Sequence, residues 1–539
     1  MSQVTPADEK ANTAHVESVA TPREDDGVII QKATQYHDAQ LKSDHDMLGT
    51  WDAVKKFRRV TLICAIAGFA AATDGYQHQM VASIVANKGF IRQFAAAGQA
   101  KINPSWVSSF GGIYSAGQVI GQFSIQFVAD GFGRKMAMYT FIVGLIIAAI
   151  VECVSTVWWH WTIAKLIGGI AVGSVQATLP VYINELAPAQ IRGFLVVTYS
   201  MWFSFGTLCA SLALKARADT NPMDWKTMIY SQFGMIGLGF LLVVFLPESP
   251  WWLVRKGKVE RARAMLEKNF KGVAGYDVDA EVSIIAATIK VQHQWDVAAK
   301  AEGPFAMLQG LNLKRFLIGS WPKVLQQFVG LAIFGSYSAY FFQLAGNKDP
   351  FLVTVIMGCL SIAAVFIDSL LVDKIGRRRM TLIGFTGACT GMVLMAIVGC
   401  LDYARPSLGA LLVFAGCLAN FFNTFQSSTS YAYLTEMPEL RFKARATGWG
   451  LAYCNLYAIL INFTVPLMIQ AWKVKSAFFF VCLGIPGTVV AYFIMPESMG
   501  RSPAEIQEMF VDRVPLRKWK GYKTDVEKDL EARMGQGEE

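Results

Sequence analysis

Asp130-Gly-Phe-Gly-Arg-Lys135 is a stretch that the chain uses twice, because it returns as Asp373-Lys-Ile-Gly-Arg-Arg378. In both copies an acidic residue is followed, after a glycine, by two basic residues. Each copy lies between two long apolar runs, as expected of a short connection between two helices. A motif repeated in the same surroundings indicates that the chain holds two copies of one structural unit.

Two further patterns recur in the same order and at similar spacing. A corner of glutamate, proline and arginine comes next in each half, as Glu185, Pro188 and Arg192 and later as Glu436, Pro438, Arg441 and Arg445. Each half then closes on Pro-Glu-Ser, which places Glu248 and Glu497 at matching positions. Three patterns in one order indicate that the duplication extends through most of the chain.

The composition places both units in a membrane. Of 539 residues, 53% are hydrophobic and only 17% are charged, which is too apolar for a soluble protein of this length. The apolar residues form twelve runs, near 60–82, 107–129, 136–157, 161–184, 193–214, 228–247, 316–343, 352–372, 380–400, 408–434, 446–470 and 476–496. Each run has about 20 residues, enough at ~1.5 Å per residue to cross a hydrocarbon core of about 30 Å. We therefore predict an all-α membrane protein with twelve transmembrane helices in two pseudo-symmetric six-helix bundles, an arrangement typical of transporters.

The polar segments divide the rest of the chain. Residues 1–54 are predicted to be a flexible cytosolic tail, residues 254–315 a cytosolic linker of short amphipathic helices, and residues 503–539 a cytosolic C-terminal tail. The two bundles then occupy residues 55–253 and 316–502.

The formal charge of +9 reflects orientation in the membrane and does not indicate nucleic-acid binding. The basic residues gather where helices leave the membrane, at Lys55, Lys56, Arg58 and Arg59, at Lys374 and Arg377–Arg379, and at Arg441, Lys443 and Arg445. By the positive-inside rule these ends and both termini lie in the cytosol. The nine cysteines give no disulfide framework, and neither a metal-ligand cluster nor a nucleophile motif is present, so we expect no metal, no cofactor and no enzyme activity.

Over about residues 55–510 the chain resembles the sugar porter family of the major facilitator superfamily. The resemblance is carried by the motifs above and by Pro180-Val-Tyr-Ile-Asn-Glu-Leu-Ala-Pro188, Pro247-Glu-Ser-Pro-Trp-Trp-Leu253, Gln326-Gln327 with Gly330, and Pro496-Glu-Ser-Met-Gly500. The Trp-Trp pair and Thr435-Glu-Met-Pro-Glu-Leu-Arg441 look most like fungal α-glucoside (maltose-type) permeases. The resemblance implies a monomeric plasma-membrane carrier that moves a small neutral sugar across the lipid bilayer, with a proton, by alternating access.

The repeated charged residues are predicted to form a gating network at the cytosolic helix ends. Carboxylates and guanidinium groups there can pair and close the inner mouth of the carrier. The residues are Asp130, Arg134, Glu185, Arg192 and Glu248 in the first half and Asp373, Arg377, Arg378, Glu436, Arg445 and Glu497 in the second. The alternative is that they only anchor helix ends.

The substrate site is expected between the two halves, near the bilayer midplane. Gln326 and Gln327 are the first candidates, and in the resembled family this pair binds sugar hydroxyls. Further candidates are Ser200, Tyr337, Tyr431, Tyr433 and Asn455, although aromatic residues at helical spacing are as often core residues. Ser200 and Ala332 replace a Gln and an Asn of the family, while Asn420, Asn423 and Gln426 suit a larger, hydroxyl-rich ligand such as a disaccharide.

Asp74 is the candidate for proton coupling. A carboxylate inside a membrane is costly unless it has a function or a partner. The family's coupling aspartate directly follows a Gly-Tyr pair, where this chain has Gln77, and Asp74 lies one helical turn earlier on roughly the same face. Arg192 is a possible partner and His78 lies one turn further on. If Asp74 is only a solvated vestibule residue, transport is passive.

Two rival functions use the same fold. A sugar sensor would signal through an extended tail, and the short C-terminal segment argues against it. A carrier for a polyol or a quinate-like acid is the other; an acid would demand a basic residue inside the bundle, and none stands out clearly between the helix ends.

Overall fold

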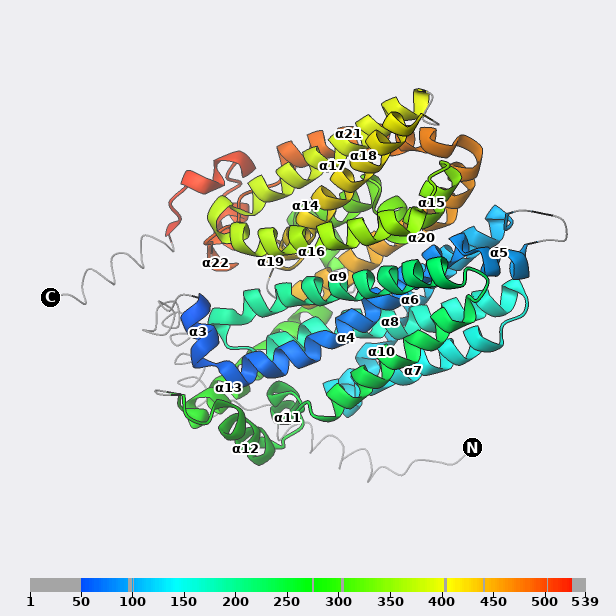
Figure 1. Cartoon of the computed structure of the whole chain (residues 1–539). Helices are drawn as coiled ribbons and strands as arrows, with labels where there is room; N and C mark the ends of the chain where they lie inside the picture. Colours follow the sequence, from blue (N-terminus) through cyan, green and yellow to red (C-terminus); the bar gives the residue numbers. More distant parts are fainter. Residues whose placement is uncertain are drawn as a thin grey trace, which may run out of the picture.

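The computed structural model describes residues 50–525, apart from residues 96–98, 100, 274–275, 302–304, 402–404, 440–441 and 502. Residues 1–49, most of the predicted N-terminal tail, and residues 526–539, the last part of the predicted C-terminal tail, lie outside this range. The first half of the chain supplies six long helices: α4 (Arg58–Ser83), α6 (Pro104–Phe132), α7 (Arg134–Val154), α8 (Trp158–Leu186), α9 (Ala189–Thr220) and α10 (Lys226–Val244). Figure 1 shows them, blue to green, as one bundle beneath the second.

The second half also supplies six spans, two of which are broken. The seventh span consists of α14 (Gly310–Phe328), a π-helical turn η4 (Ala332–Ser336) and α15 (Ser338–Leu344). The tenth divides into α18 (Pro406–Phe425) and α19 (Ser427–Glu436). The continuous spans are α16 (Pro350–Ile375), α17 (Arg377–Cys400), α20 (Lys443–Trp472) and α21 (Ala477–Ile494).

The predicted all-α membrane fold is therefore confirmed, with a helix over each of the twelve apolar runs in the described part of the chain. Judged by length and composition alone, seven helical stretches among the described residues are apolar enough to cross a membrane. The spans that fall short are α4, α6, α9 and the broken α14–α15 span, and all of them contribute polar residues to the cavity described below.

Different short helices lie at the two ends of the bundles, and these helices are used here to name the ends. The connection between the halves forms α11 (Pro250–Arg255), α12 (Val259–Phe270) and α13 (Val278–Ala301), and α3 (Thr50–Lys56) and α22 (Pro503–Val511) lie at the same end, which we call the linker end. The opposite end carries α5 (Lys88–Phe94) and α15, and we call it the far end (Figure 1).

The segment after the last span is docked onto the second half. Ile506, Met509 and Phe510 of α22 are buried, and the fully buried Trp519 packs on Phe510 with ring centroids 4.9 Å apart. Arg501 donates hydrogen bonds to the carbonyl oxygens of Trp519, at 3.1 Å, and of Tyr522, at 2.6 Å. The first part of the predicted C-terminal tail is therefore anchored to the second half as far as residue 525, because its apolar residues lie at helical spacing and pack there.

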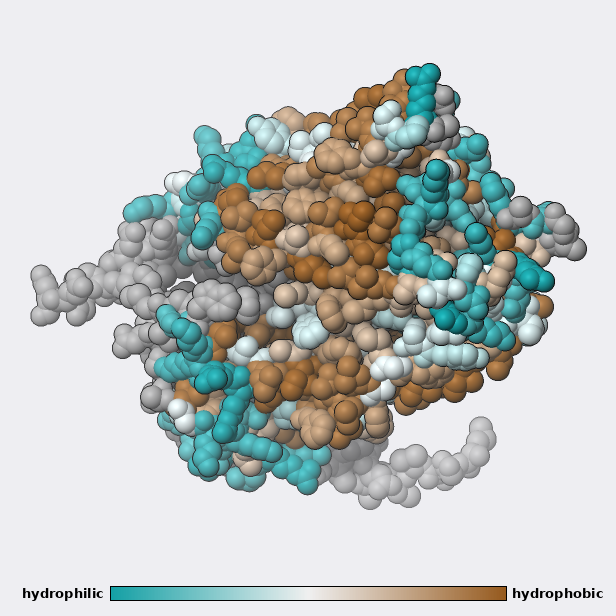
Figure 2. Space-filling view, in the orientation of Figure 1, coloured by the Kyte–Doolittle hydropathy of each residue, from teal (hydrophilic) through white to brown (hydrophobic). Residues whose placement is uncertain are grey.

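The surface matches a protein surrounded by lipid. Figure 2 shows hydrophobic residues over the middle of the molecule and hydrophilic residues gathered toward both ends. Large apolar side chains such as Phe127 and Phe245 are 82% and 72% exposed, which only an apolar solvent favours.

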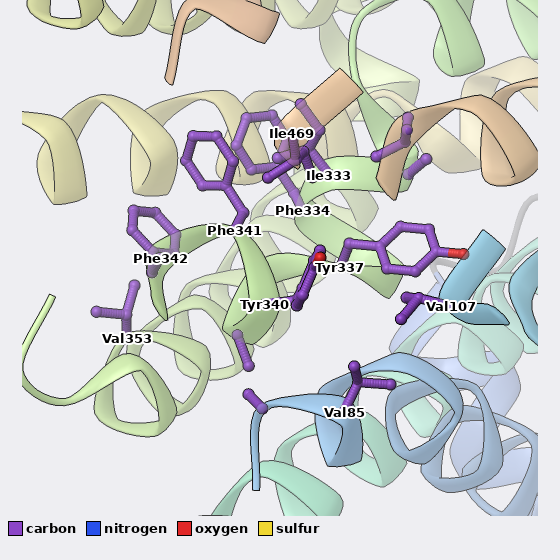
Figure 3. Packing of buried hydrophobic residues seen from close by; sticks show 14 of the residues in the cluster. Val85, Val107, Ile333, Phe334, Tyr337, Tyr340, Phe341, Phe342, Val353 and Ile469 are labelled. Atoms are coloured by element: carbon purple, nitrogen blue, oxygen red, sulfur yellow. The ribbon is translucent and has the colours of Figure 1, made fainter. Parts of the chain in front are cut away.

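The hydrophobic clusters show that the halves meet at the far end. One cluster combines first-half residues such as Val85 and Val107 with Phe334, Tyr337 and Phe341 of the second half (Figure 3). Gln343 Nε2 also donates to the Ala86 carbonyl oxygen across this junction, at 3.0 Å. At the linker end, by contrast, the two largest clusters each lie within one half, residues 57–285 and 318–519. The structure is therefore sealed at the far end.

Candidate functional site

A cavity of about 250 Å³ lies between the two halves. Its wall takes residues from α4, α6, α8 and α9 of the first half and from α14, η4, α16, α18, α19 and α20 of the second. Most of the polar wall residues are amides and hydroxyls, such as Gln118, Gln122, Ser204, Asn420 and Thr424. These groups donate and accept hydrogen bonds, as a hydroxyl-rich ligand requires.

The predicted glutamine pair of α14 lies in this wall. Gln326 Nε2 donates to the Asn423 carbonyl oxygen at 3.4 Å, while Gln326 Oε1 accepts from Lys323 Nζ at 2.8 Å. Gln327 Nε2 has a weaker contact, 3.9 Å to Cys454 Sγ. Sulfur is a weak acceptor, so the Gln327 amide retains capacity to bind a solute.

Ser200, Tyr431 and Asn455, three further candidates, also line the cavity. Tyr337 and Tyr433 do not. The Tyr337 hydroxyl donates to the Asn462 carbonyl oxygen at 3.0 Å within the far-end cluster, and the Tyr433 hydroxyl donates to the Pro496 carbonyl oxygen at 2.6 Å near the linker end. Both are fully buried core residues whose hydroxyl groups are already satisfied, and their assignment as ligand contacts is corrected accordingly.

The expectation that no basic residue lies inside the bundle is wrong. Lys323 lies in the second half of α14, lines the cavity and is only 9% exposed. Its Nζ atom bonds Gln326 and stands 3.9 Å from the centroid of the Tyr431 ring. A lysine within an otherwise apolar run, one turn before the glutamine pair, is the signal in the sequence that identifies it.

Asp74 is fully buried beside the cavity. Its Oδ2 atom accepts hydrogen bonds from the Tyr199 hydroxyl at 2.8 Å and from Gln176 Nε2 at 3.2 Å, and both of these donors line the cavity. Its Oδ1 atom has no hydrogen-bond partner among the described residues. His78 faces Ser336 across the halves, with Nε2 3.3 Å from the hydroxyl oxygen. Arg192 belongs to α9, and its side chain lies outside the described residues.

A chain of amides connects Asp74 to the second half. Asn455 Nδ2 donates to Gln122 Oε1 at 2.7 Å, Gln122 Nε2 donates to Gln176 Oε1 at 3.2 Å, and Gln176 in turn donates to Asp74. Four helices, α20, α6, α8 and α4, are joined in this way. Every amide points its donor toward the carboxylate, so a change of charge on Asp74 acts on the junction between the halves. Gln122 and Gln176 were not predicted, and isolated glutamines in two apolar runs are the only sequence signal for them.

The first-half charge network assembles at the linker end around Arg134. Its guanidinium group binds both oxygens of Glu185, at 2.9 and 3.0 Å, and Asp130 Oδ1 at 3.0 Å. Glu248 accepts from the backbone N–H of Arg134 at 2.9 Å and so caps the start of α7. Gly133, at φ 109°, allows this approach, because a Cβ atom there would lie 2.3 Å from Glu248 Oε2.

The second half repeats this arrangement in part. Arg377 Nε lies 3.7 Å from Glu436 Oε1, and Glu497 Oε2 accepts from the backbone N–H of Arg378 at 3.3 Å. Gly376, at φ 97°, matches Gly133, since a Cβ atom there would lie 2.5 Å from Glu497 Oε2. The remaining predicted members are Arg445, in the first turn of α20, and Asp373, whose side chain lies outside the described residues.

These contacts bear on the two roles considered for the charged residues. Each pair named above joins helices of one half, and none of these pairs bridges the halves. Such contacts hold the helix ends of each bundle together while the bundles move relative to each other. Because the clusters at the linker end do not join the halves in this structure, these contacts describe the anchoring within each bundle, and the closure of the mouth by the same residues stays a prediction.

Comparisons with known proteins agree on one family. Residues 60–510 match the family described as sugar (and other) transporter. The chain is 25% identical over 505 residues to hexose transporter 2 of Kluyveromyces lactis, and the alignment covers 88% of each chain. It is also 25% identical over 500 residues to the low-affinity glucose transporter HXT3 of Saccharomyces cerevisiae, with 88% of this chain and 86% of that one covered. Among solved structures, the xylose transporter XylE from E. coli in a partially occluded inward-open conformation aligns with a TM-score of 0.67 at 22% identity, over 83% of this chain and all of that one.

Proposed function

Because the chain belongs to the sugar (and other) transporter family of the major facilitator superfamily, we propose that it imports a hexose or an α-glucoside together with a proton. The chain is a membrane transporter and not an enzyme. The observation that carries the proposal is a polar cavity between two bundles that are sealed at the far end, with a buried carboxylate beside the cavity wall.

The chemistry of the wall supports a sugar as the solute. Gln326, Gln327 and Asn455 offer amides from the second half, and Ser200 and Tyr199 offer hydroxyl groups from the first. A solute held between them contacts both bundles, so its binding favours the closure that alternating access requires. The cavity volume of about 250 Å³ lies below the usual range for small-molecule sites, roughly 300–1,000 Å³, which favours a single sugar ring over a disaccharide in this conformation. The relatives named as hexose and glucose transporters also support a single sugar ring as the solute.

Asp74 is proposed to carry the proton. Its unpartnered Oδ1 atom can take a proton without breaking an existing hydrogen bond. Protonation removes the charge that strengthens the bonds from Tyr199 and Gln176 and so loosens the amide chain that reaches Asn455. Loading of the proton is thereby linked to the contact between the halves.

The linker end is proposed to face the cytosol and the far end the outside of the cell. The basic residues Lys55, Lys56 and Arg58 lie at the linker end, as the positive-inside rule requires of a cytosolic end. One chain contains both bundles and the complete cavity, so we propose that it functions as a monomer in the plasma membrane.

Uptake by the purified full-length chain in proteoliposomes tests the proposal. We expect saturable uptake of labelled glucose or maltose, and we expect Gln327→Ala to abolish it while the protein is still produced and folded. Gln309→Ala is the matched control, because this glutamine is exposed and precedes α14 outside the cavity. Full transport by Gln327→Ala would contradict the site, and binding of sugar without transport by the wild type would indicate a sensor.

A further inference from the structure

Lys323 is a buried cation whose charge is not balanced by the protein around it. Its described polar contacts are the neutral Gln326 side chain at 2.8 Å and the face of Tyr431 at 3.9 Å. Among the described residues no carboxylate lies within ion-pairing distance of Nζ. Buried charges in proteins are normally paired, because desolvation without a partner is costly.

Lys165 shows how this chain treats a buried lysine with a structural role. Its Nζ atom lies 2.7 Å from Glu152 Oε1, and both side chains are at most 2% exposed. Gln232 Nε2 donates to the other oxygen of Glu152 at 2.9 Å, and the Trp161 ring lies 4.3 Å from the lysine nitrogen. The pair is neutral overall and lies away from the cavity lining. Lys323 has the same kind of aromatic neighbour but lacks the carboxylate.

The cavity wall has a net positive character as a result. Among the described residues that line it, Lys323 is the only lysine or arginine and no aspartate or glutamate is present. His78 is the other basic side chain in the wall. Asp74 lies behind the wall and is covered from the cavity by its hydrogen-bond donors Tyr199 and Gln176. A cavity with one uncompensated cation attracts and retains an anion.

We propose that the solute is a polyhydroxylated monocarboxylic acid, a sugar acid, whose carboxylate pairs with Lys323. This inference rests on the proposed transport function and replaces its neutral sugar by an acidic one. The carboxylate replaces Gln326 Oε1 as the acceptor for the ammonium group, and the released amide then binds a hydroxyl group of the same solute. The neighbouring Gln327 amide and the Tyr431 ring hold the remainder of the sugar.

The test compares D-glucose with D-glucuronate, which differ at one carbon, in counterflow assays on proteoliposomes containing the full-length chain. Maltose and D-gluconate extend the neutral and acidic sets. We expect labelled glucuronate or gluconate to be taken up, and the acid to compete at least tenfold more effectively than the neutral sugar of the same size. Lys323→Met should lower acid uptake by about 10- to 100-fold, as expected for loss of a charged hydrogen bond, and Lys323→Arg should retain most of it.

Each result decides the inference. Transport of neutral sugars alone overturns the acid assignment and leaves the proposed function standing, whereas transport of neither set removes both. Undiminished acid uptake by a folded Lys323→Met variant overturns the role of Lys323. If that variant fails to fold, the preference of the wild-type protein between glucose and glucuronate decides the question alone.

Discussion

Replacement of Asp74 by asparagine tests the coupling mechanism most directly. The change replaces one carboxylate oxygen by an NH2 group, which removes the ionisable group and keeps the shape of the side chain. Asparagine Oδ1 can still accept from Tyr199 and Gln176, which now stand 2.8 and 3.2 Å from the carboxylate. The charged component of these hydrogen bonds is lost, about 1 kcal/mol, and the new NH2 group takes the place of the unpartnered oxygen at a further cost of about 1–3 kcal/mol, so the variant should fold with reduced stability and keep the cavity.

The expected magnitude follows from the number of carboxylates available to carry a proton. Asp74 is the buried carboxylate that is hydrogen-bonded to residues of the cavity wall. Two other acids are buried inside the spans of the described chain. Glu152 is neutralised by Lys165 at 2.7 Å, and Asp368 accepts a hydrogen bond from Ser428 and does not line the cavity, so neither is placed to exchange a proton there. One proton should therefore accompany each solute. A gradient of one pH unit is worth about 1.36 kcal/mol, which is a tenfold accumulation of solute at equilibrium.

The assay measures accumulation in proteoliposomes with an imposed pH gradient and the membrane potential held at zero. Wild-type protein should concentrate its solute about tenfold per pH unit, whereas Asp74→Asn should equilibrate it without concentrating it. Asp279→Asn is the matched control, because Asp279 is an exposed linker residue paired with Arg263. Gradient-driven accumulation by Asp74→Asn would refute the assignment of the proton to this residue, and its absence in the wild type would indicate a passive carrier.

Two further predictions concern stability and are checked by thermal unfolding in detergent. Lys165→Met leaves Glu152 buried without a charged partner and should lower the free energy of unfolding by about 3–5 kcal/mol; an unchanged unfolding temperature would show that the pair is not structural. Gly133→Ala places a Cβ atom 2.3 Å from Glu248 Oε2 at a positive φ and should cost about 1–3 kcal/mol. Gly131→Ala, in the last turn of α6 with open space around it, should change stability by less than about 1 kcal/mol, and equal losses at both glycines would contradict the capping argument.

The apolar runs and the repeated motifs were sufficient to predict the fold. Long uninterrupted runs leave little choice but a spanning helix, because an unpaired backbone is costly in lipid. The two glycines of the repeated motif are needed for the same structural reason. At Gly133 and at Gly376 the absence of a Cβ atom allows a glutamate side chain to approach and cap the start of the next helix. Repetition in the sequence thus corresponds to repetition of a contact.

The site was predicted less completely, for reasons of geometry. Residues 326 and 327 were found because a pair of amides inside a span has few other uses. Tyr337 and Tyr433 were assigned wrongly because their acceptors, the carbonyl oxygens of Asn462 and Pro496, come from segments remote in the sequence. Lys323 was missed because a single charged residue hardly changes the hydrophobicity of the long apolar run near 316–343.

The interruption of the seventh span at Gly330 has a consequence for how the protein can move. Gly330 adopts φ 96°. The segment beyond it, from η4 to the end of α15, carries Phe334, Tyr337 and Phe341. We expect this short outer segment to tilt about Gly330 while α14 keeps its place in the bundle. Both openings of the cavity would then be closed at the same time, with the solute enclosed, before the two bundles move relative to each other.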